Sequence, residues 1–171
     1  MVKKQTAGRD QLGDFAPKFA ALNDDVLFGE VWLREAGRNS ETVKPIRESA
    51  GDVLSYDRTG INAWEDQEFY DAVQATGRKK ILMAALWTEA CLTLPTINAL
   101  KEGFEVYPVV DCVRGTSLIA HDAALRRVEQ AGAVPVSLAQ LLCEFQRDWN
   151  RTETVPGFVQ LMVEAGYFLN M

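Results

Sequence analysis

Residues 66–110 read DQEFYDAVQATGRKKILMAALWTEACLTLPTINALKEGFEVYPVV and alternate between helix-like and strand-like segments. The helix-like segments end at Gly77 and Gly103, and a short apolar segment follows each glycine. Gly132 ends a third helix-like segment, LIAHDAALRRVEQA, before AVPVS. Glycine readily adopts the left-handed conformation that follows many helices, so these three positions predict helix ends. The alternation predicts an α/β domain.

Four strands are expected, near residues 53–57, 79–86, 104–110 and 133–137. The second is almost wholly apolar between Ile81 and Leu86, which is typical of a strand covered on both faces. Strands that alternate with helices are joined by right-handed crossovers, so we expect a three-layer sandwich around a mostly parallel sheet. Four strands are few for such a sheet, and another strand from elsewhere would be needed to cover its helices.

The two ends of the chain differ from this pattern. SLAQLLCEFQRDW (137–149) and TVPGFVQLMVEAGYF (154–168) are each predicted to form an amphipathic helix. Their aromatic residues either pack in a core or form a subunit interface. Residues 1–40 look helical, with no evident strand, and 36–52 form a polar connection. The predicted organisation is therefore a helical N-terminal segment (1–40) and an α/β domain (41–171).

Composition excludes several classes of function. A chain of 171 residues with 47% hydrophobic content suits one main domain. The net charge of -6, with 18 Lys and Arg residues spread along the chain, argues against a nucleic-acid partner. Three cysteines without CxxC spacing and a single histidine suggest neither a disulfide framework nor a metal site. No apolar run suits a signal peptide or a membrane span, so we expect a cytoplasmic protein without membrane contact and without a cofactor.

Chemically useful residues follow three of the predicted strands, in DRTGINAWED (57–66), WTEAC (87–91) and DCVRGTS (111–117). Open parallel sheets bind ligands beyond the carboxyl ends of their strands. Cys91 stands near the start of a helix, where the helix dipole and the first N–H groups favour a thiolate. Its own amide and that of Ala90 could stabilise an oxyanion while the thiol attacks an acyl or amide carbon. A buried structural cysteine is the alternative.

Residues 54–150 resemble the isochorismatase-like cysteine hydrolases, and the likeness is specific at INAWED and TEAC. This resemblance implies hydrolysis of a small amide, imide or ester through a covalent thiol intermediate. It also implies that Cys91 is the nucleophile. The peptide between Trp87 and Thr88 then takes the place of the family's cis bond, which helps to shape the oxyanion hole.

The same resemblance assigns roles around Cys91. Arg58 falls where the family has a catalytic basic residue, and arginine can hold an anion but cannot relay a proton as lysine can. A surface arginine is the alternative. Asn62 and Trp64 match the wall of the substrate pocket, although Trp64 could simply cover the sheet and Asn62 could form a local turn. Glu89 and Asp111 lie at the same rim and are interpreted as solvated acids rather than catalytic groups.

The N-terminal segment departs from the family's pattern. Members begin with an apolar strand that ends in the general-base aspartate, and no such strand precedes residue 53. KQTAGRDQLGDFAPKFAALNDDVLFGEVW instead resembles the opening of carboxymuconolactone decarboxylase-like proteins. No replacement acid can be assigned among the available candidates, Asp14, Asp24, Asp25 and Glu30. The alternative function is therefore a catalytically silent homologue retained for assembly or binding.

A homo-oligomer is also expected. The short sheet leaves an edge and apolar helix faces to be covered, and exposed edges and large apolar patches are normally buried. One apolar stripe of suitable length remains in the N-terminal segment, formed by Phe15, Phe19, Leu22, Val26, Leu27 and Val31.

Overall fold

The structure is a computed structural model that describes residues 32–35 and 55–168. The described residues fall into two compact units, one of residues 32–35 and 55–136 and one of residues 137–168. The predicted boundary at residue 40 and the N-terminal apolar stripe lie outside the described residues.

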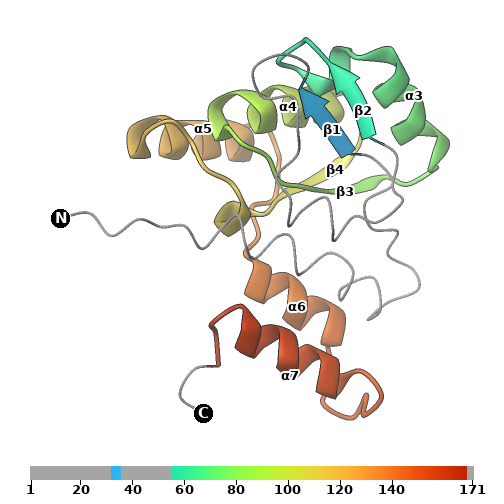
Figure 1. Cartoon of the computed structure of the whole chain (residues 1–171), viewed down its shortest axis with the longest axis vertical. Coiled ribbons are helices and arrows are strands. Elements are labelled where there is room, and N and C mark those ends of the chain that lie inside the picture. The colour runs from blue at the N-terminus through green and yellow to red at the C-terminus, as the bar shows by residue number, and fades with distance from the viewer. Residues whose placement is uncertain (1–31, 36–54, 169–171) are drawn as a thin grey trace. The chain divides into compact units, whose positions relative to one another are not determined.

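The first unit contains two pairs of parallel strands. β1 (Trp32–Glu35) pairs with β2 (Ser55–Arg58), with Trp32 opposite Ser55. β3 (Lys80–Met83) pairs with β4 (Glu105–Pro108), with Lys80 opposite Glu105. Figure 1 shows β1 and β2 side by side. All strand pairs in the described residues are parallel, which confirms the predicted parallel arrangement.

β1 corrects the sequence analysis, which expected no strand in residues 1–40. Residues 32–35 read WLRE and form a strand of four residues. Periodicity cannot distinguish a strand from part of a helix over so few residues, so the neighbouring helix-like pattern was misleading.

The fourth predicted strand is reduced to a single parallel bridge between Val136 and Val109. Its segment nevertheless runs along β4, because Val134 N and Val136 N each donate to a carbonyl of that strand, both at 2.9 Å. Pro135 lies between these two donors. Its missing N–H is tolerated because the nitrogens of consecutive residues point to opposite sides of a strand, so that of Pro135 points away from β4.

Helices connect the strands as the glycine pattern predicts. α3 (Gln67–Ala75) follows the short 3-10 helix η1 (Ala63–Glu65), α4 (Thr93–Lys101) connects β3 to β4, and α5 (Leu118–Gln130) follows the 3-10 helix η3 (Val110–Cys112). Gly77, Gly103 and Gly132 all have positive φ, which confirms the predicted helix ends.

An aromatic cluster forms a core of this unit. Trp64 is 6% exposed and meets Phe104, Phe69 and Tyr70 edge to face, with ring centroids 5.4–6.3 Å apart. Such arrangements suit the charge distribution of aromatic rings. The cluster connects η1, α3 and β4, and Ala99 of α4 also packs in it.

The second unit contains both predicted C-terminal helices, α6 (Leu138–Gln146) and α7 (Val155–Glu164). Phe158 is buried and contacts the rings of Trp149 and Phe168 at 5.4 and 6.1 Å. For Phe158, these contacts favour a role in a core over a role in a subunit interface. Trp149 remains 64% exposed. No helix in residues 55–168 is both long and apolar enough to span a membrane.

Candidate active site

Cys91 lies in a single turn of π-helix, η2 (Thr88–Leu92), which leads directly into α4. The backbone enters this turn from β3 through a cis peptide bond between Leu86 and Trp87. This bond stands one residue before the predicted position between Trp87 and Thr88. The difference arises because local sequence does not identify which non-proline bond is cis.

The thiol of Cys91 is half-buried. Trp87 O accepts from the amides of Ala90 and Leu92 at 3.2 and 3.3 Å, so the turn closes on itself. The amide of Ala90, an expected oxyanion donor, is therefore used within the turn in this structure. Leu92 is fully buried, which anchors the residue after Cys91 in the core.

Thr88, the first residue of η2, has no exposed surface and is hydrogen-bonded through its amide, its carbonyl and its hydroxyl. Its amide donates to Arg114 O at 3.1 Å, and its carbonyl accepts from Thr93 Oγ1 at 2.7 Å. Its hydroxyl is hydrogen-bonded to His121 Nδ1 at 2.9 Å. Figure 1 shows α5, which carries His121, beside α4. The start of the cysteine turn is thus bonded to α4, to the loop before α5 and to α5 itself.

Glu89 is bound to the loop before α5, contrary to its interpretation as a solvated acid. Its Oε1 accepts from the amide and the hydroxyl of Thr116, at 2.9 and 2.5 Å. These two bonds hold the pKa of the Glu89 carboxyl below its usual value, since they stabilise the charged form. A carboxylate held in this way is a poor proton acceptor for Cys91.

Arg58 is buried at the end of β2, which argues against the alternative of a surface arginine. Its Nη1 donates to the carbonyl of Gly60, two residues later. The side chain therefore folds back over the turn that follows its strand.

Asn62 and Trp64 have structural contacts. Asn62 Oδ1 accepts from Trp64 N at 3.2 Å, and its Nδ2 donates to Glu65 Oε1 at 2.9 Å, which is the local turn given as the alternative. Trp64 Nε1 donates to Glu102 Oε1 at 2.8 Å. With its ring in the aromatic cluster, Trp64 has the contacts of a core side chain. Its role in a substrate pocket remains a prediction.

Cys112 is the last residue of η3, the 3-10 helix that follows β4. Burial raises the pKa of the Cys112 thiol to about 12, and the nearby charge of Asp111 adds to this shift. Asp111 itself is exposed. The candidate acids at residues 14–30, none of which was assigned as the base, lie outside the described residues. In the part of the chain that the structure describes, no group of three or more acidic, histidine or cysteine residues could hold a metal ion.

The loop 111–117 was predicted to lie at the site, but no role was predicted for its Thr116, and His121 lies beyond the predicted segment. The sequence does hold one feature that points to His121, because it is the single histidine of the chain and follows that loop closely. Its partner, however, is 33 residues away and could not be inferred from spacing.

The family model of the isochorismatase domain matches residues 15–140, which is more than half of the chain. The chain belongs to the isochorismatase domain family. The matched range includes most of the N-terminal segment that resembles the opening of carboxymuconolactone decarboxylase-like proteins. That second resemblance remains a prediction.

Two curated relatives illustrate the isochorismatase family. The probable hydrolase YcaC of Escherichia coli strain K12 is 36% identical over 116 residues, which is 67% of this chain and 56% of YcaC. The secreted isochorismatase effector Isc1 of Phytophthora sojae is 24% identical over 133 residues, 77% of this chain and 63% of Isc1. The chain therefore spans less than two thirds of the length of each of these two relatives.

Solved structures agree in fold. The E. coli YcaC gene product, described as an octameric hydrolase of unknown specificity, has a TM-score of 0.83 at 27% identity, with 96% of this chain and 79% of that chain covered. YcaC of Pseudomonas aeruginosa, with hexane-2,5-diol and covalent acrylamide, has a TM-score of 0.81 at 29% identity, with 92% and 77% covered. These neighbours confirm the predicted isochorismatase-like α/β fold.

Proposed function

We propose that this protein is a cysteine hydrolase that acts on a small amide, imide or ester, with Cys91 as the nucleophile. The observation that carries the proposal is the position of Cys91, in the first turn of helix after a strand of a parallel sheet. Open parallel sheets bind ligands beyond the carboxyl ends of their strands. Membership of the isochorismatase domain family supports the proposal, and the P. aeruginosa relative was solved with covalent acrylamide.

The proposed reaction has two steps. The sulfur of Cys91 attacks the carbonyl carbon, a thioester forms, and the C–N or C–O bond breaks as the leaving amine or alcohol takes a proton. Water then attacks the thioester, which releases the acid and restores the thiol. The permanent positive charge of Arg58 supplies electrostatic stabilisation without proton transfer. In this proposal Asn62 supports the substrate side of the site through its turn, and Trp64 through its packing.

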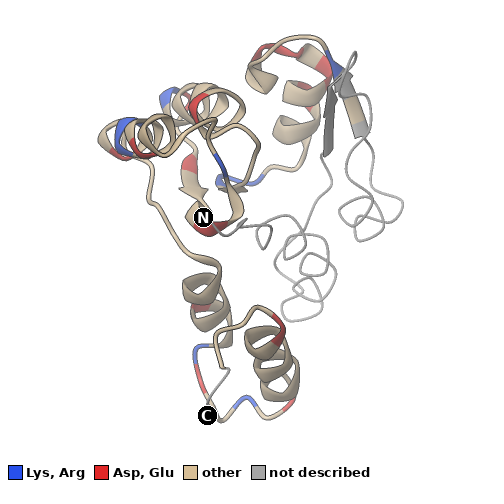
Figure 2. Cartoon of the chain, turned by 60° about the vertical axis from the view of Figure 1, so that its left-hand side comes forward, with Lys and Arg blue, Asp and Glu red and all other residues tan. Residues whose placement is uncertain are grey.

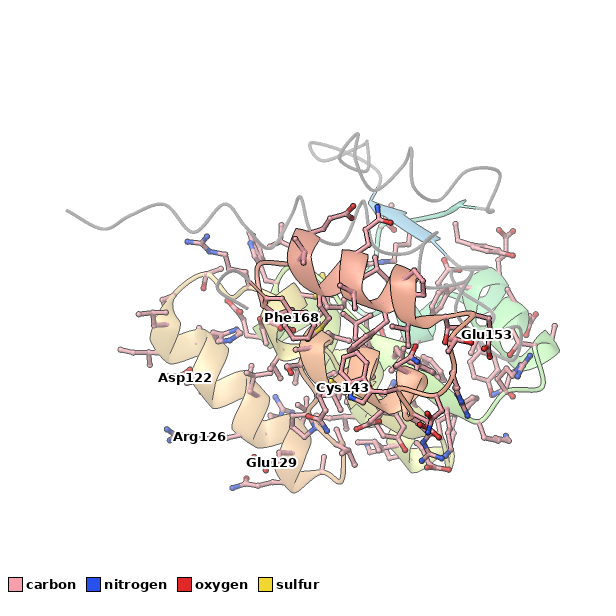
Figure 3. All side chains as sticks on the ribbon, turned by 90° about the horizontal axis from the view of Figure 1, so that it is seen from below. Asp122, Arg126, Glu129, Cys143, Glu153 and Phe168 are labelled. Atoms are coloured by element: carbon pink, nitrogen blue, oxygen red, sulfur yellow. The ribbon has the colours of Figure 1, made fainter. Side chains whose placement is uncertain are left out.

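Cys91 is expected to react with iodoacetamide and acrylamide well ahead of Cys112 and Cys143 at pH 8. Cys112 should react slowly because a thiol with a pKa of about 12 has only about one thiolate in ten thousand at that pH. Cys143 is exposed on α6 (Figure 3), so access alone should not make Cys91 the fastest thiol. The rates are measured by quenching aliquots and mapping modified peptides by mass spectrometry.

Two controls sharpen this experiment. Cys91→Ser should abolish the fast phase and leave the two slow sites unchanged. Raising the pH towards 12 should speed the reaction of Cys112, because its thiolate population grows as the pH approaches its pKa. Equal or slower labelling of Cys91 would contradict the hydrolase proposal and favour the silent homologue.

We further propose that the chain forms a homo-oligomer in the cytoplasm. The octameric E. coli relative supports this assembly. In the described residues, Leu118 and Ile119 at the start of α5 are 79% and 84% exposed, which suits an interface. The exposed side of α5 also carries charged residues of both signs, as Figure 2 shows. Three of them, labelled in Figure 3, are Asp122, Arg126 and Glu129.

Size-exclusion chromatography with light scattering is expected to give a mass several times that of the 19.0 kDa chain. Leu118→Asp together with Ile119→Asp should shift the protein towards smaller species if this end of α5 is buried between copies, because charged side chains are costly in a dry interface. The matched control is Gln130→Asp, which adds a charge at an exposed position about three turns away at the other end of the same helix. A stable 19.0 kDa species of the unmodified chain would contradict the proposal.

A further inference from the structure

Two consecutive residues of the cysteine turn are bonded to the segment that begins α5. Thr88 is bonded to His121 through its hydroxyl, and Glu89 accepts two hydrogen bonds from Thr116. We call these four residues the clasp. Thr88 is three positions before Cys91, which is about one turn of helix, so the clasp holds the turn from which the thiol projects.

The bond between Thr88 and His121 is the buried part of the clasp. Thr88 has no exposed surface, and its hydroxyl lies 2.9 Å from the imidazole Nδ1 of half-buried His121. A buried hydroxyl is costly unless it is hydrogen-bonded, and the bond fixes its direction. Valine has nearly the same shape and would avoid this requirement. The polar pair therefore contributes orientation rather than volume.

The packing around Gly115 shows how closely the clasp is fitted. A Cβ added at Gly115 would lie 2.8 Å from Glu89 Oε2 and 2.9 Å from both the amide nitrogen and Cβ of His121. Two arms of the clasp therefore meet at a position where a side chain does not fit. A methyl group at Gly115 would therefore have to displace Glu89, His121 or both.

We propose that His121 is a positioning residue for Cys91 and acts through Thr88. This inference rests on the proposed function, because it takes Cys91 as the reacting residue. His121 holds the Thr88 hydroxyl, Thr88 holds the start of η2, and the direction of the Cys91 thiol and of the surrounding N–H groups follows. His121 does not itself exchange a proton with substrate in this proposal.

The test measures alkylation of Cys91 by acrylamide in variants of the full chain. Thr88→Val keeps the shape and removes the hydroxyl, and His121→Leu keeps the approximate size and removes Nδ1. Each is expected to slow Cys91 about fivefold, which is the size of one neutral hydrogen bond. Thr88→Ser and His121→Asn retain a hydrogen-bonding atom near the same place and should restore most of the rate. Thermal unfolding of each variant shows that labelling is done on folded protein.

A double-mutant cycle identifies the pathway. If His121 acts through Thr88, the combined Thr88→Val and His121→Leu variant should be no slower than either single variant. Cys143, in the other unit, serves as the internal control and should label at the same rate in every variant.

Several outcomes would overturn the inference. It fails if both single variants stay within about twofold of the unmodified protein, if the two effects multiply independently, or if the conservative variants do not restore the rate. Failure of the proposed function looks different, because the unmodified Cys91 would then label no faster than Cys143. The ratio of variant to unmodified rate at Cys91 is measured in either case.

Discussion

Trp64→Ala is expected to lower the free energy of unfolding by about 3–5 kcal/mol, the usual range for removing a large buried aromatic ring. Trp64 is 6% exposed, lies against three aromatic rings and donates its indole N–H to Glu102. Its loss leaves a cavity in the aromatic cluster and removes the hydrogen bond to Glu102, whose exposed carboxylate can bond to water instead. Urea unfolding followed by circular dichroism measures the change.

The matched control is Trp149→Ala, which removes the same side chain from a position that is 64% exposed. A loss of less than about 1 kcal/mol is expected there. Trp64→Phe should fall between the two, because it keeps a ring in the cluster and loses the bond to Glu102. A cost of Trp64→Ala as small as that of the control would contradict the core role and return Trp64 to the substrate pocket.

Gly115→Ala is expected to lower the free energy of unfolding by about 1–3 kcal/mol, as overpacking generally does. The added methyl group would lie 2.9 Å from the backbone nitrogen of His121, which cannot rotate away as a side chain can. The loop before α5 must therefore shift, and the bonds of Thr88 and Glu89 should weaken with it. Slower alkylation of Cys91 is expected together with the loss of stability.

Gly60→Ala is the control, because a Cβ there would have its nearest neighbour at 3.9 Å, an ordinary contact. Neither glycine has a positive φ, so the comparison isolates packing from backbone strain. Gly60→Ala should leave stability within about 0.5 kcal/mol of the unmodified protein. If Gly115→Ala proved equally harmless in both measurements, the close fit of the clasp would be refuted.

The alternating pattern by itself determined the class of fold. Gly77, Gly103 and Gly132 predicted the helix ends, and the apolar run from Ile81 to Leu86 predicted the strand that precedes the cysteine turn. These signals are local, because a left-handed residue and a short apolar run depend on residues close in the chain. The position of Cys91 after that strand follows from the same local signals.

Only the tertiary structure decided the partners of these elements. The bonds from Glu89 to Thr116, from Thr88 to His121 and from Trp64 to Glu102 join residues that are 27, 33 and 38 positions apart. No spacing rule relates such residues, since they meet only after parallel strands and their crossover helices have packed. The same is true of β1, whose four residues form a strand because β2 lies beside them. The sequence determined that Cys91 follows a strand at the start of a helix, and long-range packing decided which residues hold it there.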